Sequence, residues 1–228
     1  QGLAGSGMAM GILPVGTGND NARNLGIPVG DVAAAVDVLA RGRARPTDAA
    51  RVTCADGTER WFLGVMSTGF DSNVNERANR MSWPRGQSRY TLAMLRELGS
   101  FTPVAYRVKV DGVEHVGGGM LLSIGNGPGY GGGMLICPAA DLTDGHLDLT
   151  WLAEVSKPTF LRAFPRVFKG THVDLPYVNV LRGRRITVEA AGQMAYADGE
   201  RVGPLPVTIE AVPGALRMLT PAGSTDGT

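Results

Sequence analysis

Three short stretches of the sequence place glycines beside carboxylates or amides, in patterns that can bind phosphate, bind a metal ion or accept a proton. They are residues 16–20 ("GTGND"), 141–146 ("DLTDGH") and 198–200 ("DGE"). Each pattern is also typical of a tight turn without catalytic function. The choice between the two interpretations depends on whether the fold brings the stretches together.

The first stretch follows an apolar run, residues 8–15, which we expect to be a buried strand, and precedes a short helix, residues 21–25. Backbone N–H groups at such a strand–loop–helix junction can bind phosphate. Its glycines would let the backbone approach a nucleotide, its threonine supplies a hydroxyl, and its last two residues can cap the helix while contacting the nucleotide. The candidate nucleotide-binding residues are Gly16, Thr17, Gly18, Asn19 and Asp20. The alternative is a plain βα turn with a good N-cap.

The second stretch is an acidic turn. Asp141 and Asp144 are three residues apart, and with the main-chain carbonyl of His146 they make a set of oxygen ligands suited to Mg²⁺ or Ca²⁺. The alternative is a plain turn that Gly145 closes. The triple glycine before it, residues 131–133, indicates close approach of a ligand or of another backbone segment.

The third stretch lies between two expected strands. Glu200 can act there as a general base that takes a proton from a substrate hydroxyl. The alternative is a hairpin turn at Asp198 and Gly199 with a solvated glutamate.

The remaining sequence indicates helices at the N-terminus and a β-rich remainder. Asp31 is expected to cap a helix over residues 31–42, with Val32, Ala35, Val36 and Leu39 on one face, and a second helix is expected over residues 88–101. Residues 157–170 read as a weaker helix that Pro165 interrupts. Strands are expected around the turns at residues 56–57 and 111–112 and along most of residues 147–153 and 184–220, with a frayed tail at residues 222–228.

Composition sets further bounds. The chain has 228 residues, a net charge of +1, 43% hydrophobic and 19% charged residues, and 33 glycines, which argues against extensive nucleic-acid binding and for many turns. Cys54 and Cys137 lie in apolar runs, so reduced, buried thiols and a cytoplasmic location are expected. One strand and two helices cannot cover a parallel sheet, so the first 45 residues are expected to be part of a larger domain.

In this order and spacing, the motifs closely resemble the diacylglycerol kinase catalytic-domain superfamily, in particular the bacterial lipid kinases related to sphingosine and ceramide kinases. The resemblance runs from about Met8 to Pro221. It implies an α/β nucleotide domain like those of phosphofructokinase and NAD kinase, followed by a β-sandwich, with ATP in the cleft between them. We therefore expect residues 1–45 to be a partial nucleotide domain, residues 46–221 the β-sandwich, and about 80 residues to be missing before residue 1, including the family's "GGDGT" loop.

The resemblance also implies the chemistry. Thr17 matches an ATP-contacting threonine, Asp141, Asp144 and the His146 carbonyl match a largely structural Mg²⁺ site, and Glu200 matches the proposed proton acceptor. The expected reaction transfers the γ-phosphate of ATP to the hydroxyl of a membrane lipid, with diacylglycerol as the expected acceptor and phosphatidic acid as the product. Peripheral membrane contact is expected. Trp83, Arg85, Arg89 and Tyr90 are the candidate residues for it, the alternative for this stretch being an ordinary exposed loop, and a homodimer is left open. The alternatives are an NAD kinase-like enzyme, another small-alcohol kinase, and a non-catalytic lipid-binding paralogue or inactive fragment.

Overall fold

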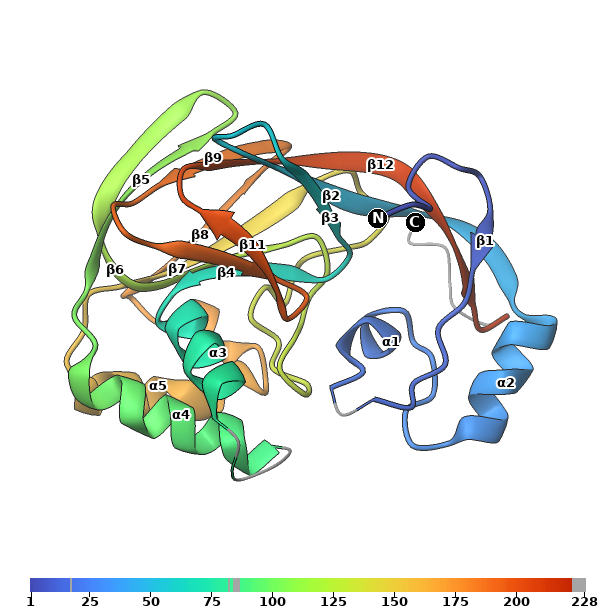
Figure 1. Cartoon of the computed structure of the whole chain (residues 1–228), viewed down its shortest axis with the longest axis horizontal. Helices are drawn as coiled ribbons and strands as arrows, with labels where there is room; N and C mark the ends of the chain where they lie inside the picture. Colours follow the sequence, from blue (N-terminus) through green and yellow to red (C-terminus); the bar gives the residue numbers. More distant parts are fainter. Residues whose placement is uncertain (17, 82, 84–86, 223–228) are drawn as a thin grey trace.

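The fold was analysed in a computed structural model, which describes residues 1–16, 18–81, 83 and 87–222. Within these residues, twelve strands form one hydrogen-bonded sheet that folds over into two layers, as in a β-sandwich (Figure 1). Three helices cover one side of it at one end, and two helices lie at the other end. The expected β-sandwich is therefore confirmed.

The bounds of the elements are as follows. The strands are β1 (Ala9–Met10), β2 (Arg43–Cys54), β3 (Glu59–Phe62), β4 (Val65–Gly69), β5 (Val104–Val110), β6 (Val113–Gly125), β7 (Leu147–Ala153), β8 (Val178–Gly183), β9 (Arg185–Glu189), β10 (Met194–Ala197), β11 (Glu200–Pro204) and β12 (Val207–Thr220). The helices are α1 (Asp20–Asn24), α2 (Val32–Arg41), α3 (Phe70–Arg80), α4 (Gln87–Ser100), α5 (Lys157–Val167) and a 3₁₀ turn, η1 (Thr171–Asp174).

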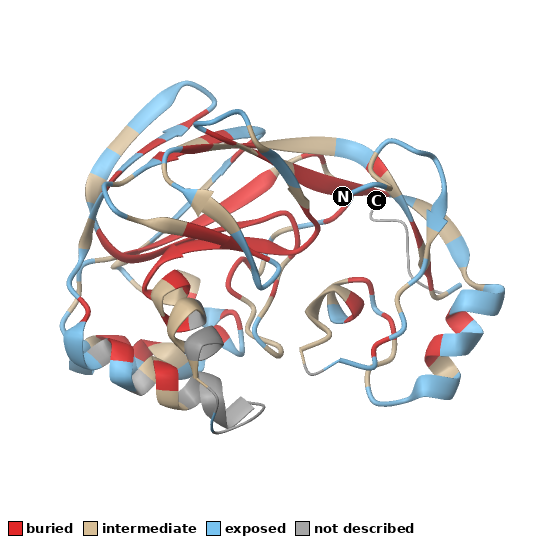
Figure 2. Ribbon diagram, in the orientation of Figure 1, coloured by how far each residue is buried: buried red, intermediate tan, exposed pale blue. Residues whose placement is uncertain are grey.

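The sheet runs in the order β11-β10-β4-β6-β5-β9-β12-β2-β3, and β7 and β8 branch from β6. Asp111 and Gly112 both have positive φ in the β5–β6 hairpin, as the expected Asp-Gly turn requires. Alternating side chains of β5 (Tyr106, Val108 and Val110) are buried, so one face of this strand points into the space between the layers. Figure 2 shows this buried interior.

A second apolar layer lies between the sheet and helices α3, α4 and α5. Phe70 of α3 makes edge contacts with Phe101 and with Phe160 of α5, at centroid distances of 5.4 and 4.8 Å. The sequence did not predict α3, because only a few apolar side chains, such as Phe70 and Val74, mark its buried face. The interruption expected in α5 was wrong: the helix continues through Pro165, which lies on its exposed face, where water can hydrogen-bond the carbonyl that loses its partner.

The N-terminal segment is joined to the sandwich by the last strand, because β1 pairs in parallel with β12. The expected buried strand over residues 8–15 is reduced to Ala9–Met10, and neither residue is buried. In α2, the Asp31 side chain accepts the backbone N–H of Ala34, so the predicted cap is confirmed. The predicted apolar face was partly wrong.

Of that face, Ala35 is buried, and the second buried residue of α2 is Val38. Val32, Val36 and Leu39 are 36–50% exposed. The described N-terminal residues do not by themselves form an α/β domain, and β2 begins at Arg43, before the boundary expected at residue 45. That domain and its boundary therefore stay predictions.

Both cysteines are buried and unpaired, as expected. Burial raises the pKa of the Cys137 thiol to about 12, so it is protonated at neutral pH. Among the helices of the described residues, none is long and apolar enough to cross a bilayer.

Candidate active site

Helix α1 joins the first stretch to two distant parts of the chain through three polar side chains. The Asn21 amide donates to Asp198 in the DGE corner at 3.1 Å, and the Asn24 amide donates to the Gly129 carbonyl at 2.9 Å. Asp20 accepts the backbone N–H groups of Gly132 and Gly133 at 2.9–3.0 Å. The five-residue helix therefore places the loop at residues 16–19 beside the glycine run and beside the DGE corner.

Asp20 has a different role from the one its sequence position suggested. The helix has Asn19 at its N-cap in the left-handed conformation, with no side-chain capping bond. Asn19 instead closes the loop on itself: its amide donates to the Gly16 carbonyl and its oxygen accepts the Gly16 N–H. Asp20 positions the 131–133 loop. All three of its glycines have positive φ, and the N–H groups of Gly132 and Gly133 reach the Asp20 carboxylate.

The DGE corner is built around the carboxylate of Asp198, which faces the backbone of residues 63–65 although the residue as a whole is exposed. It accepts the backbone N–H groups of Leu63, Gly64 and Val65 at 2.8–3.2 Å, in addition to the Asn21 amide. Burial raises the pKa of Asp198, while these four donors act in the opposite direction. A Cβ at Gly64 would lie 2.7 Å from Asp198 Oδ1, so only glycine allows this approach.

The sequence-predicted residues are brought together only in part. Glu200 is exposed at the start of β11, two residues after Asp198, and the Gly16–Asp20 stretch lies beside the same corner through α1. Thr17 lies outside the described residues. The acidic turn is held by a buried carboxylate: Asp48 of β2 accepts the Gly145 N–H at 2.6 Å and the Gly214 N–H of β12 at 2.8 Å.

The acidic turn has the donor types of a Mg²⁺ site, but its carboxylates are already engaged. One oxygen of Asp141 accepts the Thr143 N–H and hydroxyl, and one oxygen of Asp144 accepts the His146 N–H. The other oxygen of Asp144 pairs with the Arg182 guanidinium. Among the described residues, no group of three acidic, histidine or cysteine side chains is placed to share a metal ion. In this arrangement the Asp144 carboxylate is paired with Arg182, so the predicted ligand set of two carboxylates and one main-chain carbonyl stays a prediction.

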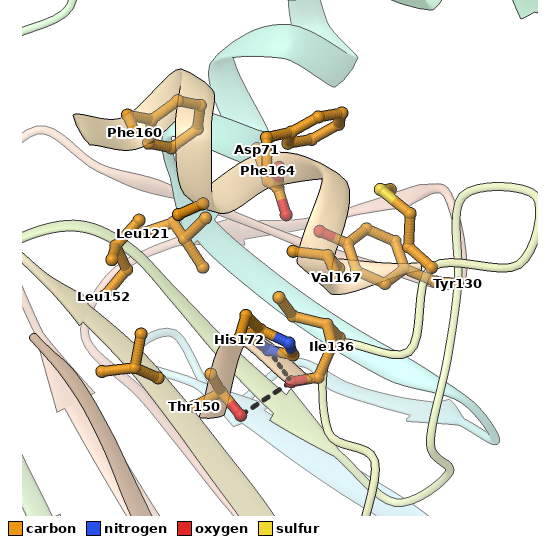
Figure 3. Close-up of a pocket in the computed structure, with 13 residues that line it drawn as sticks. Asp71, Leu121, Tyr130, Ile136, Thr150, Leu152, Phe160, Phe164, Val167 and His172 are labelled. Carbon is orange, nitrogen blue, oxygen red and sulfur yellow. Dashed lines mark hydrogen bonds between the residues drawn. The ribbon is translucent and has the colours of Figure 1, made fainter. Parts of the chain in front are cut away.

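An apolar cavity of about 40 Å³ lies on the far side of the 129–137 loop, below α3 and α5 (Figure 3). The carboxylate of Asp71 points toward it from α3, and Tyr130 closes it from the glycine-rich loop. The other lining residues are Leu121, Met134, Ile136, Thr150, Leu152, Phe160, Ala163, Phe164, Val167, His172 and Val178. One loop therefore borders both the polar corner at α1 and an apolar space.

Comparisons with known proteins decide the family. Residues 64–220 match the family profile of the YegS C-terminal NAD kinase beta sandwich-like domain, and residues 1–52 match the diacylglycerol kinase catalytic domain. A diacylglycerol kinase of Mycobacterium tuberculosis is 46% identical over 222 residues, which cover 97% of this chain and 72% of that protein. The chain belongs to the diacylglycerol kinase family.

Other relatives agree with this family. A candidate YegS-like lipid kinase of Stenotrophomonas maltophilia is 31% identical over 97% of the chain and 72% of its own length. Among solved structures, a candidate diacylglycerol kinase from Bacillus anthracis str. Sterne has the same fold, with a TM-score of 0.73 at 21% identity. That match covers 95% of this lipid kinase chain and 71% of the solved one.

Four polar residues of this lipid kinase organise the region and were not singled out from the sequence. They are Asn21, Asn24, Asp48 and Asp71. The first two stand within an Asx-rich stretch, which is a usable signal for hydrogen bonds that bridge loops. No local sequence pattern marks Asp48 or Asp71. The hydrogen-bond partner of Asp48 in β12 and the residues that line the cavity beside Asp71 come from distant parts of the chain.

Asp71 is a half-buried acid whose Oδ2 is shielded from solvent, and no ion pair found among the described residues involves it. Its Oδ2 has no hydrogen-bond partner within the described residues, and burial raises its pKa to about 7. Between the unfolded-state pKa near 4 and this value, the folded kinase holds a proton that the unfolded chain has released. Its free energy of unfolding therefore falls as the pH rises through this window, by a total on the order of 4 kcal/mol.

Replacing Asp71 by Asn is expected to remove this pH dependence. The variant and the parent should melt at similar temperatures near about pH 4, and the variant should become progressively the more stable of the two up to about pH 8. Thermal melts followed by circular dichroism over this range measure the difference. Parallel curves for the two proteins would show that Asp71 does not carry a raised pKa.

Proposed function

We propose that the intact protein transfers the γ-phosphate of ATP to the hydroxyl of a membrane lipid, with diacylglycerol as the acceptor. The observation that supports this most is the pair of contacts from α1: Asp20 to the glycine loop and Asn21 to Asp198. They bring a glycine-rich loop suited to phosphate and an exposed carboxylate to neighbouring positions. Membership of the family and the names of its relatives supply the reaction class.

In this proposal each stretch has a separate task. The backbone of Gly16 and Gly18, with Thr17 and Asn19, contacts the nucleotide phosphates, where close approach needs small residues. Asp20 keeps the glycine loop in place. Such positioning is the main contribution that a protein makes to phosphoryl transfer.

Glu200 is proposed as the proton acceptor. The acceptor hydroxyl oxygen attacks the γ-phosphorus, the bond from that phosphorus to the β,γ-bridging oxygen breaks, and ADP leaves with the electron pair. Glu200 takes the hydroxyl proton as the new P–O bond forms. Its exposure at the start of β11 leaves its carboxylate accessible to a substrate.

The metal assignment stays a prediction without a step in this mechanism. Asp141, Asp144 and the His146 carbonyl remain the candidate ligands, and Mg²⁺ binding there would require Arg182 to leave Asp144. The guanidinium already supplies a positive charge to this turn, so the turn has a stabilising partner without a metal ion.

The apolar cavity is proposed to receive part of the acceptor's apolar portion. Its volume of about 40 Å³ is too small for an extended acyl chain, so binding requires α5 or the 129–137 loop to shift outward. Because the same loop contacts Asp20, the acceptor would lie on one side of it and the nucleotide on the other.

The acceptor class is tested by a phosphorylation assay on the intact protein with labelled ATP. Diacylglycerol, sphingosine and NAD are offered separately, under the same conditions. We expect labelled phosphatidic acid from diacylglycerol and little product from the other two. Phosphorylation of NAD alone would favour the NAD kinase-like alternative, and no transfer to any acceptor would favour a non-catalytic lipid-binding protein.

A further inference from the structure

Helix α5 has two faces with different chemistry. Its inward residues, Phe160, Ala163, Phe164 and Val167, are spaced by three or four positions and line the apolar cavity. Its outward residues follow the same spacing on the opposite side and include Leu161, which is 46% exposed. The helix is therefore the wall between the cavity and the surface.

The outward face is cationic. Between Glu154 and Asp174 the chain contains Lys157, Arg162, Arg166 and Lys169 and no acidic residue, a local charge of +4 in a chain whose net charge is only +1. All four are exposed. No ion pair found in the described part of the chain involves any of them, although Lys157 donates to the Gly99 carbonyl.

Exposed apolar side chains lie among these charges. Leu161 is within the helix, and Phe168, immediately after it, is 45% exposed. A helix with cations and large apolar side chains on its free face is typical of a segment that lies in the interface of an anionic bilayer. Each lysine or arginine near such a surface increases the membrane-binding constant by about tenfold or less, and apolar side chains that insert into the bilayer increase it further.

We propose that the outward face of α5, with Lys169 just beyond it, docks on membranes that contain anionic phospholipids. The biological role of this docking rests on the proposed function, because docking would place the cavity wall at the membrane that contains the acceptor lipid. The surface differs from the Trp83 region expected from the sequence. Of that region, Arg85 lies outside the described residues, as do the side chains of Arg89 and Tyr90, while Trp83 is 77% exposed.

The test measures binding to vesicles without ATP, so it does not depend on catalysis. The protein is sedimented with vesicles of phosphatidylcholine, with or without phosphatidylglycerol. We expect binding only with the anionic lipid, weakened by added salt. Arg162→Glu combined with Arg166→Glu should weaken binding by at least about 30-fold.

A matched control changes the same number of charges elsewhere. Lys109→Glu combined with Arg184→Glu alters the region of the β5–β6 hairpin and should leave binding unchanged. The tip of this hairpin lies at the top of the view in Figure 1, whereas α5 lies at the bottom. Equal binding by the parent and the α5 variant, or no binding by the parent, would overturn the proposal. So would concentration-dependent dimerisation that the α5 variant abolishes, since a second copy would then be the partner.

Activity distinguishes this proposal from the proposed function. A short-chain diacylglycerol dissolved as monomers needs no membrane, so the α5 variant should phosphorylate it at the parental rate. If the parent protein itself does not phosphorylate the short-chain lipid, the kinase assignment is wrong, but the vesicle-binding result still stands.

Discussion

Replacing Glu200 by Gln in the intact protein is expected to lower turnover by at least ~10²-fold, because the amide cannot accept the hydroxyl proton during transfer. The side chain keeps nearly the same size, and Glu200 is exposed on β11, so the fold should be unaffected. Turnover is measured with labelled ATP and diacylglycerol at saturating concentrations of both. The melting temperature is recorded in parallel to confirm that the variant is folded.

Glu114→Gln is the matched control for this substitution. Glu114 is an exposed glutamate on β6 that pairs with Arg107, and exposed pairs of this kind contribute little to stability. Its turnover should stay within a factor of about two of the parent. Near-parental turnover of the Glu200 variant would show that another group accepts the proton.

Replacing Asp198 by Ala is expected to cost about 3–5 kcal/mol of unfolding free energy, because three backbone N–H groups and the Asn21 amide lose their shared acceptor. For a domain of this size, such a loss corresponds to a fall in melting temperature of roughly 10 °C. Calorimetry on the parent and the variant measures both quantities. Turnover should fall as well, because Glu200 is positioned by this corner.

Asp198→Asn separates the loss of the hydrogen-bond acceptor from the loss of the negative charge. Asparagine keeps one acceptor oxygen and tolerates the positive φ of 49° at this position, so the variant should have an intermediate melting temperature. An alanine variant that melts with the parent would mean that the four donors find other partners. The role assigned to Asp198 would then be wrong.

Local signals predicted local structure well. Asp31 caps α2 as its position indicated, and the positive φ values at Asp111 and Gly112 match an Asp-Gly hairpin. Such features depend on a few adjacent residues. Strands were also expected along most of residues 184–220, and the last of them, β12, is one long strand with a bulge, because the interruption at Pro213–Ala215 changes the register without ending the pairing with β2.

Long-range features were much harder to predict. Asp20 was expected to cap a helix. Besides pairing with Arg23, it accepts N–H groups 112 and 113 residues away, and the partner of Asn21 is 177 residues away. A hydrogen bond over such a separation leaves no periodic signal in the chain. The family resemblance supplied the expectation that these stretches meet, while which side chain joins which loop became visible only in three dimensions.

The contacts of Asp48 also have a consequence for how the two longest strands align. A slide of β2 against β12 by two residues would keep every side chain on its own face, so the pleat alone does not forbid it. The slide would, however, take the Asp48 carboxylate away from Gly214 in the bulge and from Gly145 outside the pair, and leave a charge stranded in the interior. A single acid thus fixes the register of the two strands. Through β12 it also fixes the position of β1, which pairs with that strand and precedes the candidate nucleotide-binding stretch.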